Sequence, residues 1–231
     1  MREYTVEQSS LIYRWTFNNL LSSLPGPGTT VFGALCRELR PYGISPSGIT
    51  LDAPTTRLDD VILAISLFDE RVKLRLSYGW FELSVDDLYE GDEVALVKIV
   101  EALFKVLKEI DANADQGRTY INIYAHLSLS PLEADLFLHD HLHGGKAIAD
   151  LIPDAFAYKL KTNNTAEAQD LRIVVAKSLR FPNALFVSFS SEYPIPGPPS
   201  QVAEQISKDY QQSLALLGLK PKTEPAGKDE Q

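Results

Sequence analysis

The sequence predicts an α+β domain in which a curved, mainly antiparallel sheet carries helices packed on one face. Several short segments between residues 61 and 191 alternate apolar and polar side chains, which is the period-two pattern of half-buried strands. Two longer segments, 92–110 and 201–217, repeat apolar residues with the spacing of amphipathic helices. A helix with one apolar stripe needs a surface to cover, so we expect both helices to pack on the sheet.

The chain of 231 residues has the composition of an ordinary globular domain, with 45% hydrophobic and 23% charged residues. This composition excludes collagen-like, wholly disordered and disulfide-rich classes. We expect a single domain over residues 1–219, with a helical N-terminal segment at 1–45 and the sheet with its helices at 46–219. Residues 220–231 are rich in Lys, Pro, Glu and Gly and predict a disordered tail.

The N-terminal segment is predicted to form two helices. From Thr5 to Leu24 apolar residues recur at roughly helical spacing, and Thr5 with Gln8 fits a capping box. The Pro and Gly residues that follow end this helix. A second apolar stretch at 31–39 predicts a shorter helix.

The strands are predicted from residue 61 onward. Residues 61–68 and 71–78 flank the pair Asp69 and Glu70, which is typical of a hairpin. Val72, Leu74 and Leu76 then alternate with basic residues, so one face of this strand is expected to be polar. The other predicted strands are 80–85, 119–130, 171–178 and 184–191.

Caps and stops define the helices of the second part. Asp92 is expected to cap the helix at 92–110, and Ser200 the helix at 201–217, which Gly218 ends. Residues 131–143 fit either a short helix or an extended segment, and the pattern leaves this choice open.

The segments 59–110 and 170–217 share the order strand, turn, strand, connection, helix. A duplicated strand-strand-helix unit would explain this order, and coincidence within an ordinary α+β domain is the alternative.

Charge and cysteine content restrict the partners and the compartment. The chain has 22 basic and 31 acidic side chains, a formal charge of −9, which disfavours nucleic acid as a partner. The single cysteine, Cys36, cannot form an internal disulfide and fits the cytoplasm. Charged residues interrupt both the first thirty residues and the apolar helix at 92–110, so we expect neither a signal peptide nor a membrane span.

A histidine cluster is the sharpest local anomaly. The run HDHLH contains His139, His141 and His143, and imidazole nitrogens are common ligands of a divalent metal such as zinc. The spacing matches no common zinc signature, and a helix end that carries histidines is the simpler interpretation. Under the metal hypothesis, His126 reaches the cluster from its strand.

A polar sheet face is the second candidate site. If the strands at 71–78 and 119–130 belong to one sheet, their outward side chains form a polar, aromatic and locally basic surface. The candidate binding residues on this surface are Arg71, Lys73, Arg75, Tyr120, Asn122, Tyr124 and His126. An exposed sheet face without a ligand, or a symmetric dimer contact, fits the same pattern.

The function predicted from these features is a cytoplasmic, non-catalytic binding or assembly module that acts through the polar sheet face or through self-association. The expected partner is another protein or a second copy of the chain, with an anionic small ligand as an alternative; no membrane is expected. No nucleophile with a placed base is identifiable, so no catalytic residue is predicted. The competing hypothesis is a metal-dependent hydrolase that uses the histidine cluster, whereas no other cofactor is predicted.

Overall fold

The computed structural model describes residues 1–21, 30–44, 46–52, 61–130, 133–142, 155–161, 170–193 and 199–222. The strands are β1 (Arg2–Phe17), β2 (Ile49–Asp52), β3 (Ile62–Leu67), β4 (Val72–Leu76), β5 (Trp80–Val85), β6 (Gly117–Ser128), β7 (Ala155–Lys161), β8 (Asp170–Lys177), β9 (Ala184–Tyr193) and β10 (Leu219–Pro221). The helices are α1 (Thr30–Leu39), α2 (Asp92–Ile110), α3 (Glu133–Leu142) and α4 (Pro199–Leu216), with short 3-10 turns at Arg40–Tyr42 and Pro46–Gly48. The α+β class is therefore confirmed.

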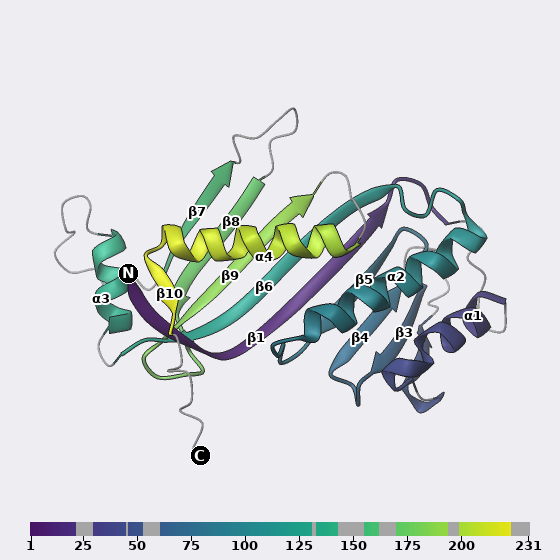
Figure 1. The fold of residues 1–231 in the computed structure, drawn as a ribbon, viewed down its shortest axis with the longest axis horizontal. Coiled ribbons are helices and arrows are strands. Elements are labelled where there is room, and N and C mark those ends of the chain that lie inside the picture. Colours follow the sequence, from purple (N-terminus) through teal and green to yellow (C-terminus); the bar gives the residue numbers. More distant parts are fainter. Residues whose placement is uncertain are drawn as a thin grey trace, which may run out of the picture.

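All of these strands join one open sheet. Its order is β2-β3-β4-β5-β1-β6-β9-β8-β7, and each neighbour along this order is antiparallel to the next. The short β10 pairs with the start of β1 in parallel. Figure 1 shows β1 and β6 running side by side through the middle of the sheet.

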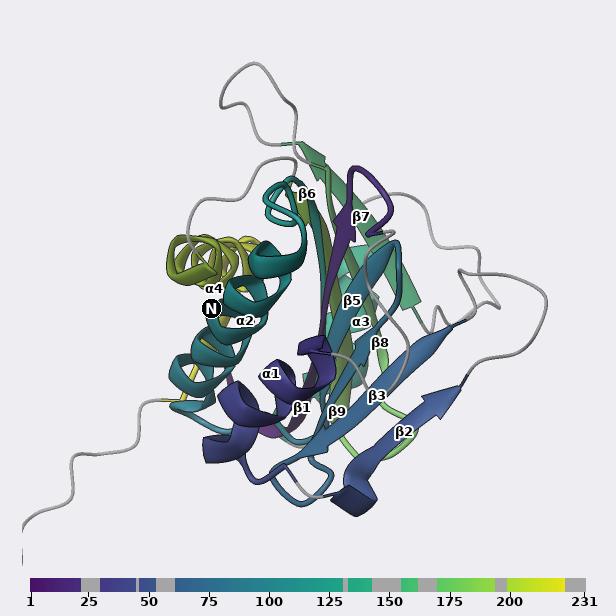
Figure 2. The ribbon, with the colours of Figure 1, turned by 90° about the vertical axis from the view of Figure 1, so that its right-hand side faces the viewer.

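The helices α1, α2 and α4 lie on one face of the sheet (Figure 2). They cover the apolar half of the alternating strand pattern, because Trp15 and Phe81 are fully buried on that face. The Trp15 ring meets Phe104 of α2 edge to face, with centroids 5.1 Å apart. On the other half of the sheet, Tyr210 of α4 contacts Phe189 of β9 in the same way at 5.7 Å.

The predicted helix at 5–24 is wrong, because residues 2–17 form the central strand β1. Tyr13, Trp15 and Phe17 are buried while Arg14 and Thr16 are exposed, which is an alternation of period two. This strand gains hydrogen-bonded neighbours on both sides, β5 and β6, and a helix there would leave both edges unpaired. Helix α1 confirms the second predicted helix, so the segment 1–45 is only partly helical.

Several elements differ in detail from the sequence-based expectations. The hairpin at 61–78 is confirmed as β3 and β4, and residues 133–142 form a helix instead of an extended segment. The strands β2, β7 and β10 were not predicted. Because β10 includes Lys220 and Pro221, the predicted tail at 220–231 begins too early; residues 223–231 lie outside the described residues. None of the helices in the described part of the chain combines the length and apolar character that a membrane crossing requires.

Candidate functional site

The sheet face opposite α1, α2 and α4 is the surface on which the sequence placed a binding site; we call it the open sheet face. On β6, Ile121, Ile123 and Ala125 are buried under the helices, so the alternate residues point to the open sheet face. The structure places Tyr120, Asn122, Tyr124 and His126 there in one row.

Hydrogen bonds fix the middle of this row. The Asn122 amide nitrogen donates to the Tyr124 hydroxyl at 2.6 Å and reaches the Tyr120 hydroxyl at 3.5 Å. The Ser188 hydroxyl on β9 donates to the Asn122 amide oxygen at 3.2 Å. Two effects raise the pKa of the Tyr124 hydroxyl: partial burial, which is the larger, and the electrostatic effect of the nearby Tyr120. The hydroxyl therefore stays neutral at physiological pH.

An aromatic patch surrounds the end of the same row; it consists of Tyr124, His126, Phe181 and Phe186. Tyr124 stacks on Phe186 with centroids 5.9 Å apart, and the His126 ring lies 5.1 Å from Phe181 and 5.3 Å from Phe186. Burial and the nearby Arg180 lower the pKa of His126, which favours the neutral imidazole.

His126 also contacts a serine hydroxyl that belongs to the turn before β9. Its Nδ1 lies 2.9 Å from the Ser178 hydroxyl oxygen. That oxygen already accepts backbone N–H groups from Arg180 at 3.2 Å and Phe181 at 3.0 Å. Both lone pairs are thus used within the turn, so the hydroxyl proton is available to the imidazole nitrogen and the contact joins His126 to the turn.

An ionic cluster occupies the other half of the open sheet face; it consists of Arg14, Lys73, Arg75 and Glu82. The Glu82 carboxylate lies 2.5 Å from the Arg14 guanidinium and 3.7 Å from that of Arg75. Lys73 lies 3.9 Å from the Asp86 carboxylate. Two strands, β5 and β1, separate Lys73 and Arg75 from the β6 row, a distance of roughly 14 Å at about 4.8 Å per strand.

Arg71 does not share this surface. It lies in the β3–β4 turn, and its guanidinium bonds the Asp92 carboxylate of α2 at 2.5 and 3.1 Å. It also lies 5.0 Å over the Tyr89 ring. The Arg71 hydrogen bonds are the main cause that lowers the pKa of Asp92. Arg71 therefore anchors the start of α2, and the predicted binding set divides into three groups.

The predicted metal site is not brought together within the described residues. His139 and His141 lie two positions apart on α3 and project in different directions. The His141 ring stacks on Phe156 at 5.3 Å, and its Nδ1 lies 2.9 Å from the Phe137 carbonyl oxygen. His143 lies outside the described residues, and among those that are described no three His, Cys, Asp or Glu side chains converge as metal ligands. His126 belongs to the open sheet face, which α3 does not cover.

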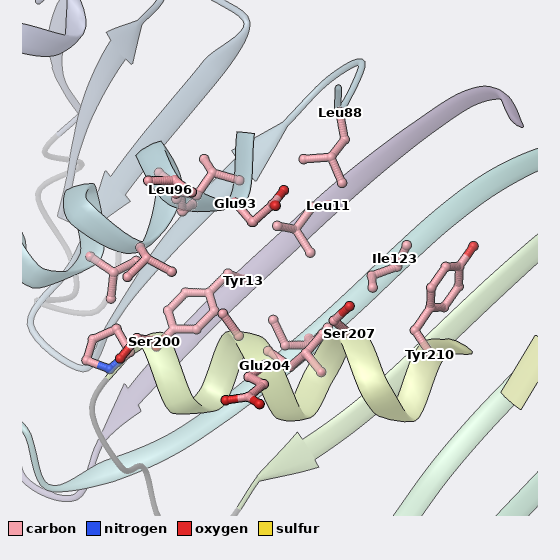
Figure 3. A pocket seen from close by; sticks show the side chains of 18 of the residues that line it. Leu11, Tyr13, Leu88, Glu93, Leu96, Ile123, Ser200, Glu204, Ser207 and Tyr210 are labelled. Atoms are coloured by element: carbon pink, nitrogen blue, oxygen red, sulfur yellow. The ribbon is translucent and has the colours of Figure 1, made fainter. Parts of the chain in front are cut away.

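A feature that sequence reasoning missed lies on the opposite side of the sheet. A groove of about 1000 Å³ is lined by both α2 and α4, which also contact each other; we call it the inter-helix groove (Figure 3). Leu11 and Tyr13 of β1 with Ile121 and Ile123 of β6 form its floor. Burial raises the pKa of Tyr13 to about 12, so its hydroxyl stays neutral there.

The lining of the groove comes from five elements of the described chain that are far apart in the sequence, namely β1, β5, α2, β6 and α4, and its floor exists only because residues 2–17 form a strand. The apolar stripe of each helix was visible in the sequence, but the gap between the stripes is a property of their packing.

In comparisons with known proteins, no family model matches the chain and no curated protein matches it significantly.

Proposed function

We propose that this protein is a cytoplasmic, non-catalytic assembly module that associates with a second copy of itself through the open sheet face. The observation that carries the proposal is the asymmetry of the sheet: helices cover one face, while the aromatic patch and the ionic cluster lie on the other (Figure 2).

The size of the open sheet face supports a stable contact. Eight neighbouring strands contribute to it, which in the order of the sheet are β3, β4, β5, β1, β6, β9, β8 and β7. At about 4.8 Å between strands and roughly six residues per strand, the face covers on the order of 800 Å². Stable protein interfaces bury about this area on each partner.

The residue types favour a protein surface over an anionic ligand. Tyr, Phe and Arg are enriched at the centres of protein interfaces. The Glu82 carboxylate lies between Arg14 and Arg75 and takes up hydrogen-bonding or ionic contacts of both, so these cations are already engaged within the protein and are less available to an anionic ligand. A second copy is the occupant we propose, because most soluble oligomers are symmetric assemblies of one chain.

The test compares two variants that each add a carboxylate. Phe186→Asp places it within the aromatic patch, and Leu216→Asp places it on the exposed end of α4, where Leu216 is 72% exposed. We expect wild type and Leu216→Asp to sediment at twice the chain mass of 25.7 kDa at about 50 µM, and Phe186→Asp to sediment as a monomer with an unchanged circular dichroism spectrum. A monomeric wild type, or a dimeric Phe186→Asp variant, would overturn the proposal.

We also propose that the fold arose by internal duplication. On one side of the β1–β6 pair the order is β3-β4-β5-β1, and on the other side it is β7-β8-β9-β6. Helices α2 and α4 follow β5 and β9 in corresponding places. This correspondence matches β4 with β8, whereas the order of the predicted segments matches 61–68 with 171–178. An experimental structure in which the two halves fail to superpose would contradict the duplication.

The metal-dependent hydrolase has weaker support, since His141 is engaged with Phe137 and Phe156. Elemental analysis of untagged protein tests it. Less than 0.1 equivalent of metal, with stability unchanged by a chelator, would exclude this alternative.

A further inference from the structure

We infer that the inter-helix groove is a docking site for an amphipathic helix of a partner protein, with an apolar stripe flanked by basic residues. This inference is independent of self-association, because the groove and the open sheet face lie on opposite faces of the sheet.

The groove has the shape and the apolar walls that such a helix requires. Leu96, Val97 and Val100 of α2 form one wall, and Ala203 and Ile206 of α4 contribute to the other. Several of the α4 side chains that line the groove are small, namely Ser200, Ala203 and Ser207, and they leave space beside α4 (Figure 3). A helix laid along the groove would contact α2, α4 and the floor, which is the helix-in-groove mode of recognition.

The length and volume of the groove fit about three helical turns. Its lining covers residues 93–101 of α2 and 199–211 of α4, roughly 13 and 19 Å at 1.5 Å per residue. A three-turn helix about 16 Å long and 10 Å wide occupies roughly 1300 Å³. The groove of about 1000 Å³ would enclose most of this helix and leave one flank outside.

Exposed apolar side chains at the rim show that the protein's own helices leave this surface incompletely covered. Val6 and Val94 line the groove and are 54% and 57% exposed. Leu11 on the floor is only half-buried, whereas Trp15 further along β1 is fully buried. Contiguous apolar surface of this kind marks sites of interaction.

The charge at the mouth of the groove determines the chemistry of the partner. Glu93, Glu101 and Glu204 line it against Lys98 and Lys208. A fatty acid or another anionic amphiphile would meet this excess of carboxylates, whereas basic residues flanking an apolar stripe would pair with them.

The test uses three fluorescein-labelled peptides of fourteen residues. The first places Leu on one helical face and Lys elsewhere, the second scrambles the same residues, and the third replaces Lys with Glu. We expect the first peptide to bind the 231-residue chain saturably, and the other two to bind at least tenfold more weakly, as measured by fluorescence anisotropy.

Two tryptophan variants of α4 locate the binding. Ser207→Trp fills the groove from an exposed position, and Gln212→Trp adds the same ring to an exposed position of α4 outside the lining. We expect Ser207→Trp to lower the affinity for the Leu/Lys peptide at least tenfold. Gln212→Trp should change this affinity less than twofold. Replacement of Glu93, Glu101 and Glu204 by Gln in one variant should lower the affinity for this peptide about tenfold. The same variant should bind the neutral dye N-phenyl-1-naphthylamine as tightly as wild type does.

Three results would overturn the inference. Equal affinity for the scrambled peptide would mean attraction by charge alone, and an unchanged affinity of Ser207→Trp would place the site elsewhere. Binding of the neutral dye without binding of any peptide would assign the groove to a small apolar ligand. The peptide titration is repeated on the Phe186→Asp variant to separate a failure of this inference from a failure of the self-association proposal. Peptide binding should be unchanged in that variant, because the groove does not depend on a second copy.

Discussion

Glu82 organises the ionic cluster at the level of single residues. It is only 7% exposed, and the strand registers place Arg14 of β1 and Arg75 of β4 directly beside it. The backbone pairing of three strands thus brings one carboxylate between two guanidinium groups, and neither pair is evident from sequence spacing.

Replacement of Glu82 by Gln should lower the free energy of unfolding by about 1 kcal/mol, because two cations then remain without a carboxylate between them. Both guanidinium groups are partly exposed, so the loss is smaller than for a fully buried ion pair. Urea denaturation measures this change. Glu192→Gln is the matched control, since its contact with Arg118 at 3.3 Å joins two exposed side chains and should cost less than about 0.5 kcal/mol. Equal losses in the two variants would contradict the special position of Glu82.

His126 should make stability depend on pH. Its pKa in the folded protein lies below the ordinary value of 6.5, so the unfolded chain binds the proton more readily. Stability is therefore expected to fall as the pH is lowered through 6.5 toward the lower pKa of His126 in the folded protein. His126→Gln should reduce this dependence, whereas His139→Gln, at an exposed position of α3, should retain it. An identical pH profile for wild type and His126→Gln would contradict the prediction.

At the level of secondary structure, the close approach of β1 and β6 depends on Gly117. A Cβ atom there would lie 2.2 Å from the Thr16 carbonyl oxygen and 2.8 Å from the Trp15 ring. Gly117→Ala should therefore lower the free energy of unfolding by at least about 2 kcal/mol, because strand or ring must move.

Gly33 provides the opposite case within a helix. A Cβ atom on Gly33 of α1 would meet nothing within 4 Å. Gly33→Ala should raise the free energy of unfolding by roughly 0.5 to 1 kcal/mol, since alanine favours helix. Thermal unfolding of the two glycine variants should shift in opposite directions, and a shift in the same direction would contradict this reasoning.

The start of α2 differs from the predicted cap. Gly91 precedes the helix at a φ of +89°, and Asp92 lies in the first turn, where its carboxylate accepts the Tyr89 N–H at 2.8 Å and pairs with Arg71. The sequence indicated an acidic helix start correctly, but the arginine comes from a turn 21 positions earlier.

Asp92→Asn should cost about 1 to 2 kcal/mol at neutral pH, because a charged hydrogen bond to Arg71 is lost. The lowered pKa of Asp92 contributes stability above its ordinary value of 3.8, and this contribution disappears as the pH falls through the lower folded value. The difference from wild type should therefore shrink below about pH 4 in urea titrations. Asp86→Asn, which removes an exposed carboxylate 3.9 Å from Lys73, is the control and should cost less than about 0.5 kcal/mol.

Strands with strict alternation were the elements best predicted from sequence. The pattern of 119–130 fixed which side chains of β6 face the helices. The same pattern was present in Leu11, Tyr13, Trp15 and Phe17, but an apparent helical spacing that included Leu20 and Leu21 obscured it. The helical spacing over residues 5–24 predicts a helix in place of β1, so the sequence pattern does not predict the order of the sheet, the contact of Arg14 with Glu82 or the inter-helix groove.

At the scale of the whole molecule, the sheet couples the two halves of the chain. β1 pairs with β5 from the first half and with β6 from the second, so neither half retains its central strand pair alone. We expect urea unfolding followed by the fluorescence of Trp15 and Trp80 to coincide with far-ultraviolet circular dichroism in one transition. Two separate transitions would mean that the halves fold independently.

The central position of β1 also has a consequence for synthesis in the cell. Its main partner β6 ends at Ser128, so about 110 further residues must be translated before the pair can close. At roughly 5 to 20 residues per second the ribosome takes about 6 to 20 s over this stretch. During that interval the edge of β1 that pairs with β6 has no hydrogen-bonding partner, and we expect the nascent chain to be prone to aggregation until β6 is synthesised.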